Sequence, residues 1–288
     1  MTTSQIDAGE LRSWIGRSET RSDVIDPRPV ELLSATLDRD DPPPRRGDAL
    51  PPLWHWLYFL PSFRESDVGP DGHQKRGGFL PPVPLPRRMW AGSRIEWLRP
   101  LAIGDEVVRV SRIASVEPKA GKSGALVFVV VRHELSTAGG LALTEEHDIV
   151  YRDPPSAEAR AGAANAGTPP GPATWKRRIV PDDVLLFRYS ALTFNSHRIH
   201  YDRRYVTEVE GYPGLVVHGP LLATLLVDLL RRERPAAVLR RFEFRALAPL
   251  FDGTAFDVCG RPEDERTASL WAKGAAGATA MRATATSS

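Results

Sequence analysis

The sequence lacks the features of secreted proteins. Its single cysteine, Cys259, cannot form an internal disulfide. The first residues, MTTSQIDAGELRSW, have neither the basic start nor the apolar core of a signal peptide. These two absences lead us to expect a reducing, cytoplasmic setting.

Long apolar runs and a bias of charge are also missing. The longest apolar stretch, residues 215–230, is interrupted by His218, Gly219 and Asp228 and is shorter than the roughly 20 residues that cross a bilayer as a helix. Thirty-eight basic residues against 36 acidic ones give a net charge of +2, and the basic residues are scattered. We therefore expect no membrane span and no nucleic-acid partner.

The chain does contain enough apolar material for one or two domains. Hydrophobic residues make up 42% of the 288 positions, and this length exceeds the roughly 100 to 200 residues of a usual domain. At 153–173, Ala, Gly and Pro replace large apolar residues, so this segment has no face to bury. The expected organisation is a module over 9–152, a linker over 153–173 and a second module over 174–286.

Apolar spacing predicts a helix and a sheet in each module. In the first module it favours a helix over 28–38 and strands over 107–110, 126–133 and 141–144. In the second module, one long helix over 216–232 precedes strands over 238–247, 254–259, 268–273 and 278–285. A weak internal repeat, RIEWLRPLAIGD (94–105) and RFEFRALAPLFDGT (241–254), supports two related units, and we expect an α+β fold.

Residue types that carry chemistry are densest from Leu192 to Arg232, which holds three of the seven histidines. Pro220 fits a first helical turn, where a missing N–H is tolerated, so His218 and Gly219 would place backbone N–H groups at the positive end of a helix. Without a side chain, Gly219 would let a thioester carbonyl approach the backbone closely. The pattern also fits a plain helix start with a glycine turn.

His200 is the candidate acid and base, because imidazole titrates near neutral pH. Asn195, five residues earlier, offers an amide that can hold a water, and Arg198, Tyr201 and Asp202 add further polar groups. A lone histidine is more often structural, but core packing alone does not explain so many polar neighbours.

Metal and nucleophilic chemistry are the competing interpretations. His197 and His200 are three residues apart and could bind zinc with His218, although neither a nearby cysteine nor an HExxH glutamate accompanies them. No G-x-S-x-G elbow occurs, and Cys259 falls in a predicted strand. We expect neither a resident metal nor a redox cofactor.

Together these residues resemble a known family. The segment is similar to the R-specific enoyl-CoA hydratases of the MaoC-like, hot-dog group, which have an Asp, four residues, a His and a later His-Gly that opens the central helix. Asn195, His200 and His218-Gly219 meet that spacing, with Asn in the place of Asp. Three longer segments, LPPLWHWLYFLP (50–61), DGHQKRGGFLPPVPLPRRMWAG (71–92) and EEHDIVYR (145–152), resemble the double-hot-dog, FAS1-like dehydratases.

That branch includes the mesaconyl-C4-CoA and itaconyl-CoA hydratases and the type 2 hydroxyacyl-thioester dehydratases. The resemblance implies a double hot-dog fold, with a helix wrapped by an antiparallel sheet in each module. It assigns the catalytic histidine to His200 and the oxyanion donor to Gly219. Asn195 would only orient the water, so His200 would act as both base and acid, with Asp202 as a less favoured source of a carboxylate.

The resemblance also implies different tasks for the two modules. The first has no Asp/Asn-x4-His followed by His-Gly, so it would be non-catalytic and would pack beside the second to form the acyl pocket. Its aromatic residues would wall that pocket or fill the core: Trp54, Trp56, Tyr58, Phe59 and Trp90. Further substrate-binding candidates are Arg198, Tyr201, His218, Arg87 and Arg88, with arginine suited to a second carboxylate or to CoA phosphates.

The expected activity is that of a hydro-lyase acting on an enoyl-CoA, most simply a C5 dicarboxylyl-CoA such as mesaconyl-C4-CoA or itaconyl-CoA. Coenzyme A would be part of the substrate, and the chain is expected to form a homodimer. One alternative is a dehydratase of straight-chain 3-hydroxyacyl-ACP or acyl-CoA. The other is a non-catalytic acyl-CoA-binding hot-dog protein, in which Asn195 marks the loss of catalysis.

Overall fold

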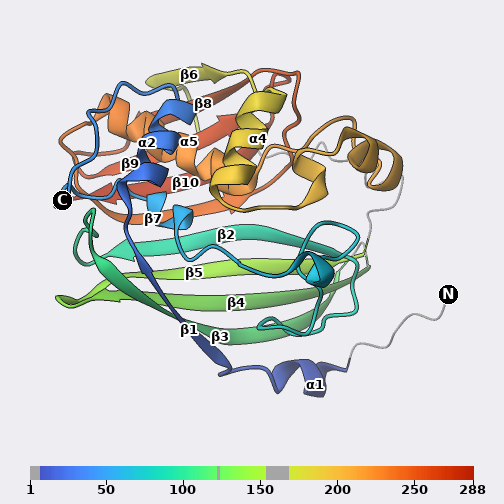
Figure 1. Ribbon diagram of the computed structural model, residues 1–288. Coiled ribbons are helices and arrows are strands. Elements are labelled where there is room, and N and C mark those ends of the chain that lie inside the picture. The colour runs from blue at the N-terminus through green and yellow to red at the C-terminus, as the bar shows by residue number, and fades with distance from the viewer. Residues whose placement is uncertain (1–6, 122–123, 154–168) are drawn as a thin grey trace.

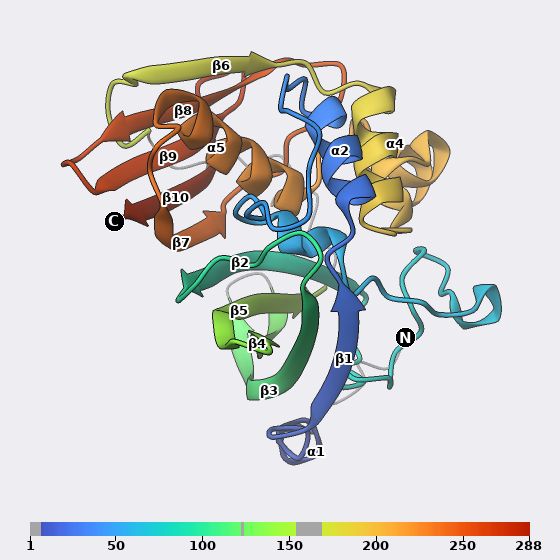
Figure 2. The ribbon, with the colours of Figure 1, turned by 60° about the vertical axis from the view of Figure 1, so that its left-hand side comes forward.

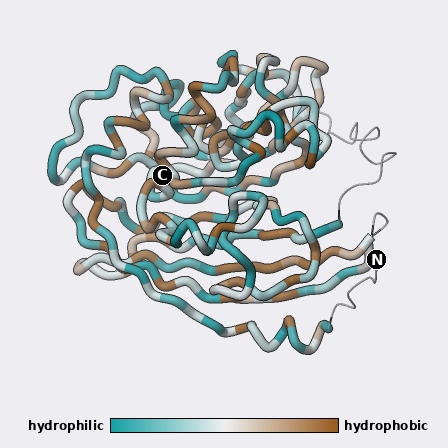
Figure 3. The backbone as a smooth tube through the Cα atoms, turned by 45° about the vertical axis from the view of Figure 1, so that its right-hand side comes forward, coloured by the Kyte–Doolittle hydropathy of each residue, from teal (hydrophilic) through white to brown (hydrophobic). Residues whose placement is uncertain are grey.

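A ten-stranded antiparallel sheet dominates the computed structural model, which describes residues 7–121, 124–153 and 169–288. The strand order is β1-β3-β4-β5-β2-β7-β10-β9-β8-β6. Figure 1 shows the first five strands below and the last five above, with most of the helical chain packed in the upper half. Figure 3 shows hydrophobic and hydrophilic residues alternating along many of these strands.

The first module contributes one half of the sheet. Its elements are α1 (Ala8–Arg12), β1 (Ser18–Val24), α2 (Pro27–Thr36), β2 (Arg87–Trp97), β3 (Glu106–Gly121), β4 (Gly124–Thr137) and β5 (Gly140–Arg152). Short 3-10 turns lie at Trp54–Leu57 and Glu65–Asp67. The strands predicted from alternation lie inside β3, β4 and β5, which are longer than the sequence pattern indicated.

The second module wraps its half of the sheet around one buried helix. Its elements are β6 (Trp175–Ile179), α4 (Asp183–Leu192), α5 (Gly219–Glu233), β7 (Leu239–Ala246), β8 (Phe256–Pro262), β9 (Thr267–Lys273) and β10 (Thr279–Ser287). A 3-10 turn at Arg198–His200 and a π-helical turn at Tyr205–Val209 lie before α5. Every residue from Leu221 to Leu230 is buried, which explains why this helix has almost no polar face.

The two halves join through β2 and β7, the strands that begin the internal repeat. Ile95 pairs with Phe242 in antiparallel register, and both side chains are fully buried. Arg94 opposes Glu243 and Glu96 opposes Arg241, so the two copies meet as related strands. The arrangement confirms the double hot-dog fold.

The modules are not equal copies, however. The helix of the first module, α2, packs against α4 of the second module, as Figure 2 shows. Just after α2, Arg39 forms an ion pair of 2.5 Å with Asp228 of α5. The sheet of the first module is therefore left with the Trp54–Leu57 turn and a cavity over its inner face.

The predicted linker falls mostly on residues 154–168, which lie outside the described residues. Asp153 and residues 169–173 mark its two ends. Cys259 is a buried free thiol in β8. Within the described part of the chain, no helix is both long enough and apolar enough to cross a membrane.

Candidate active site

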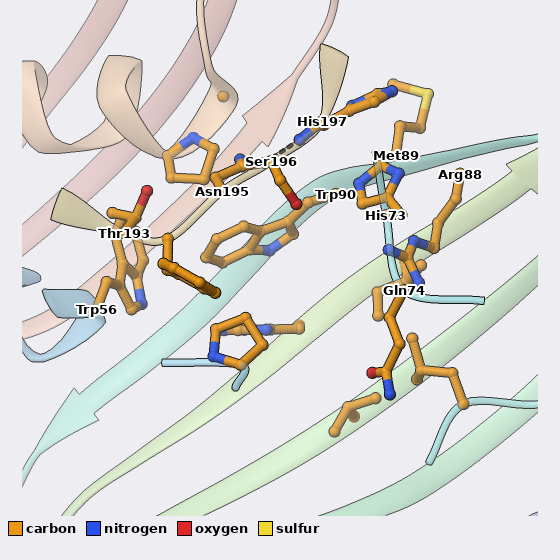
Figure 4. A pocket seen from close by; sticks show the side chains of 18 of the residues that line it. Trp56, His73, Gln74, Arg88, Met89, Trp90, Thr193, Asn195, Ser196 and His197 are labelled. Atoms are coloured by element: carbon orange, nitrogen blue, oxygen red, sulfur yellow. Dashed lines mark hydrogen bonds between the residues drawn. The ribbon is translucent and has the colours of Figure 1, made fainter. Parts of the chain in front are cut away.

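A cavity of about 690 Å³ lies where the two modules meet. Its walls come from the inner face of the first module's sheet, from residues 193–197, 199 and 200, and from the start of α5. Figure 4 shows residues of both modules around it. This is a volume typical of sites that hold a small molecule or a cofactor-sized group.

His200 lines this cavity from the end of the Arg198–His200 turn and is 7% exposed. Its Nδ1 lies 2.7 Å from the carbonyl oxygen of Val216. Because a carbonyl can only accept, Nδ1 carries the hydrogen and Nε2 keeps a free lone pair. Burial lowers the pKa of His200 to about 4, so the ring is neutral at pH 7 and can take up a proton.

Gly219 lines the cavity as the first residue of α5. The N-cap residue His218 makes no side-chain capping bond, so the first N–H groups of this helix have no capping acceptor from it. A Cβ at Gly219 would meet only the backbone oxygen of Trp90, at 3.9 Å. The helix start therefore offers a positive dipole end and open space, as an oxyanion requires.

His218 itself lies behind the cavity wall. It is fully buried, stacks on His200 with ring centroids 3.7 Å apart, and shares a 2.8 Å hydrogen bond with the hydroxyl of Ser190. Burial lowers its pKa well below the usual value. It is not among the cavity-lining residues, so the structure places it as a support for His200 rather than at the cavity surface.

Asn195 lines the cavity and begins a tight turn. Its Oδ1 accepts a 3.0 Å hydrogen bond from the backbone N–H of His197. The amide NH₂ remains as the group that can donate to a water. The structure thus brings Asn195, His200 and Gly219 to one cavity, as the motif predicted.

Two predicted substrate contacts lie elsewhere. The guanidinium of Arg198 pairs with Asp202 at 2.7 Å and donates to the carbonyl oxygen of Pro70, outside the cavity lining. Tyr201 is 47% exposed, and its hydroxyl donates to the carbonyl oxygen of Ser196. The 3-10 turn explains both positions, because it directs His200 to the cavity and Arg198 and Tyr201 away from it.

Arg87 and Arg88 both line the cavity, but only Arg87 is paired with an acidic residue. Arg87 is held by an ion pair of 2.7 Å with Glu210. Arg88 makes no ion pair with an acidic residue in the described part of the chain; it hydrogen-bonds with Tyr151, and its charge also acts on His73 and His197. Arg88 is therefore one cation available to an anionic group in the cavity, which Lys75, Arg76, Arg109 and Arg152 also line.

The aromatic residues divide between wall and core. Four of them line the cavity, namely Trp56, Tyr58, Phe59 and Trp90, whereas Trp54 is 1% exposed in the core. Trp56 and Trp90 meet edge to face at 4.9 Å. Both lie close to the junction of the two modules, so they form the wall nearest the start of α5.

A buried polar cluster on the first module's sheet was not predicted. Glu145, 2% exposed, accepts bonds from Trp56 Nε1 at 3.1 Å and lies 2.9 Å from His55 Nε2. His147 Nε2 approaches Glu145 at 2.7 Å, off the line of a hydrogen bond, and its ring packs against Trp90 with the centroids 4.1 Å apart. Despite the cost of burial, His147 and His55 hold the pKa of Glu145 well below its usual value. One inner wall of the cavity is therefore charged.

A second missed group comes from the loop of the first module. Asp71 and His73 line the cavity and lie beside His197, with one nitrogen or oxygen atom of each within 4.8 Å of the others. Asp71 and His73 sit in the segment DGHQKRGG, whose Asp-x-His spacing was the available signal. The predicted set of His197, His200 and His218 is instead a row of ring contacts.

Comparisons with known proteins agree with this geometry. The family model of type 2 hydroxyacyl-thioester dehydratases matches residues 53–252. The chain belongs to this family. A mesaconyl-C(4)-CoA hydratase of Chloroflexus aurantiacus is 45% identical over 279 residues, covering 97% of this chain and 98% of that protein.

More distant members and solved structures extend the comparison. The mitochondrial type 2 hydroxyacyl-thioester dehydratase of Schizosaccharomyces pombe is 28% identical, covering 86% of this chain and 90% of its own. A MaoC-like dehydratase structure superposes with a TM-score of 0.70 at 14% identity, covering 95% and 98% of the two chains. A Mycobacterium tuberculosis protein described as a double hot-dog fold gives 0.53 at 13% identity, covering 95% and 96%. These structures support the fold of this family member.

Proposed function

We propose that this protein is a hydro-lyase that adds water to, or removes it from, the double bond of an enoyl-CoA. The observation that carries the proposal is the meeting of a neutral, buried His200 and the open start of α5 in one cavity. Membership of the type 2 hydroxyacyl-thioester dehydratase family supports the same chemistry.

In the hydration direction, Nε2 of His200 takes a proton from a water held by the amide of Asn195. The water oxygen bonds to the β-carbon, and the electron pair of the double bond moves toward the thioester oxygen. The N–H of Gly219 stabilises the negative charge on that oxygen. His200 then returns the proton to the α-carbon, so the ring ends neutral, as it began.

For the acyl group we propose a C5 dicarboxylyl chain, such as mesaconyl-C4-CoA. The 45% identical relative is named for that substrate. Arg88 supplies a cation with no acidic partner among the described residues, and the charged Glu145 cluster would be costly to cover with a straight alkyl chain. These features favour a polar acyl group over a long apolar one.

A spectrophotometric panel of mesaconyl-, itaconyl-, crotonyl- and longer enoyl-CoA thioesters tests the proposal. We expect loss of the enoyl-thioester absorbance, with the highest kcat/KM for a dicarboxylic compound. The His200→Ala variant should lower kcat by about 100-fold or more. Tight binding of every thioester without turnover would instead identify a non-catalytic acyl-CoA-binding protein, and a preference for long chains would identify a straight-chain dehydratase.

A further inference from the structure

A loop of the first module is locked onto the catalytic segment of the second. The backbone N–H of Arg198 donates to the carbonyl oxygen of Asp71 at 2.9 Å, and the hydroxyl of Ser196 donates to that of Gly72 at 2.5 Å. Gly72 has φ +88°, and a Cβ there would lie 1.8 Å from the carbonyl oxygen of Ser196. Only glycine permits this approach, which fixes Asp71 and His73 next to residues 195–198.

Asp71 holds His73 in one orientation and one tautomer. One carboxylate oxygen accepts from the backbone N–H of His73 and the other lies 3.0 Å from its Nδ1, both at hydrogen-bond distance. Burial opposes ionisation of Asp71 and is the largest single effect, but the hydrogen bonds from His73 and the neighbouring histidine rings together lower the pKa of Asp71. Nδ1 therefore carries the hydrogen, and Nε2 of His73 has a free lone pair, as in His200.

The oriented ring belongs to the same side of the cavity as His200. His73 and His197 lie with ring centroids 4.0 Å apart, and His197 meets His200 edge to face at 5.4 Å. Figure 4 shows His73 and His197 next to each other, with Asn195 on the same chain segment as His197. His73, His197, His200 and Asn195 all line the cavity.

The proposed reaction lacks a second hydrogen-bond acceptor for the attacking water. An attacking water has two hydrogens and two lone pairs, and one lone pair must face the β-carbon. Asn195 donates to the other lone pair, and His200 accepts one hydrogen. The amide oxygen of Asn195 is already engaged by His197, so it does not hold the remaining hydrogen.

We propose that His73 is a second catalytic imidazole, supplied by the first module, whose Nε2 accepts the remaining hydrogen of the attacking water. Asp71 is its positioning residue. This inference rests on the proposed hydro-lyase function and names the group that completes it. The balance is unchanged: one proton goes from water to His200 and on to the α-carbon, while the product hydroxyl keeps the other, hydrogen-bonded to His73.

A metal ion held by Asp71, His73 and His197 is the competing use of these atoms. The rings of His73 and His197 have their centroids 4.0 Å apart and are tilted by 37°. Asp71 and His73 are also already joined by hydrogen bonds. The geometry therefore favours a hydrogen-bonded Asp71–His73 pair over a metal site.

Steady-state kinetics of His73→Ala, His73→Gln and Asp71→Asn test the proposal on the best substrate of the thioester panel. We expect His73→Ala to lower kcat by roughly 10- to 100-fold with KM changed less than about threefold. His73→Gln keeps an acceptor and should recover part of this loss, and added imidazole should partly rescue His73→Ala. Asp71→Asn should lower kcat by about tenfold, because the tautomer is no longer fixed.

The matched control is Ser66→Ala, an exposed residue of the same loop region outside the cavity lining, which should behave as wild type. Thermal unfolding of each variant separates a loss of chemistry from a loss of structure. If His73→Ala does not fold, the rate of His73→Gln tests the proposal in its place. Rates of His73→Ala within threefold of Ser66→Ala would overturn the proposal. Loss of wild-type activity on chelation, restored by Zn²⁺, would overturn it in favour of a metal. Inactive wild-type enzyme on every thioester would instead reject the proposed function itself.

Discussion

Acidification should reveal the buried state of His200 in the rate of hydration. With a pKa of about 4 for this ring, roughly one ring in ten is protonated at pH 5 and half at pH 4. Protonated Nε2 cannot take a proton from water. We therefore expect kcat/KM to stay level from pH 8 to about pH 5, to halve near pH 4, and to fall about tenfold per unit below that.

The assay is the initial rate of loss of enoyl-thioester absorbance after dilution of enzyme from pH 7 into each buffer. Brief exposure matters, because the same burial makes the fold sensitive to acid. The pKa of His200 is below the unfolded value of 6.5, so its contribution to stability is complete above pH 6.5 and is lost as pH falls through about 4. The shift corresponds to about 3 kcal/mol at most.

A half-maximal rate near pH 6.5 would refute this reasoning, since it would mean that His200 titrates as a solvated histidine. The His73→Ala variant adds a second check. A protonated His73 lowers the pKa of His200, so its removal should move the acid limb toward higher pH, whereas Ser66→Ala should leave the limb in place. A purely structural role for His73 does not predict that displacement.

Two further predictions concern arginine residues and their partners. Arg88→Gln should raise the KM for a dicarboxylyl-CoA by roughly 10- to 100-fold and change the KM for crotonyl-CoA by less than about threefold. Both values come from the same absorbance assay, and equal effects on the two substrates would contradict carboxylate recognition. Asp228→Asn should lower the free energy of unfolding by about 3 kcal/mol in denaturant titrations, because Arg39, Arg177 and Arg232 all pair with this buried carboxylate, and an effect below about 1 kcal/mol would show that the cluster is dispensable.

Local patterns made much of the fold predictable from sequence. Alternating residues marked β4 and β5, and the nearly continuous apolar face of α5 marked a helix inside a sheet. The pattern of α2 predicted a helix but not its partner, because an apolar stripe does not specify which surface covers it. Its packing on α4 depends on contacts between the modules, including the bond from Arg39 to Asp228.

The site was predictable to the extent that it is contiguous. Asn195, His200 and Gly219 fall within 25 positions, and a turn followed by a helix start brings them to one cavity. Arg198 is just as near in sequence, yet the turn directs its side chain to Asp202. Asp71 and His73 are more than 120 positions away from that segment, so only the docking of the loop shows that they belong to it.

The replacement of aspartate by Asn195 has a physical consequence that links the two modules. A site with Asp and His in one segment has its acid–base groups within a single module, so the other module needs only to shape the pocket. With Asn195, the proposed acceptors for the two hydrogens of the water are His200 in one module and His73 in the other. The hydrogen bonds from Ser196 and Arg198 to the loop then become a requirement for chemistry, because they set the distance between the two rings. Loosening that contact should cost turnover before it costs stability.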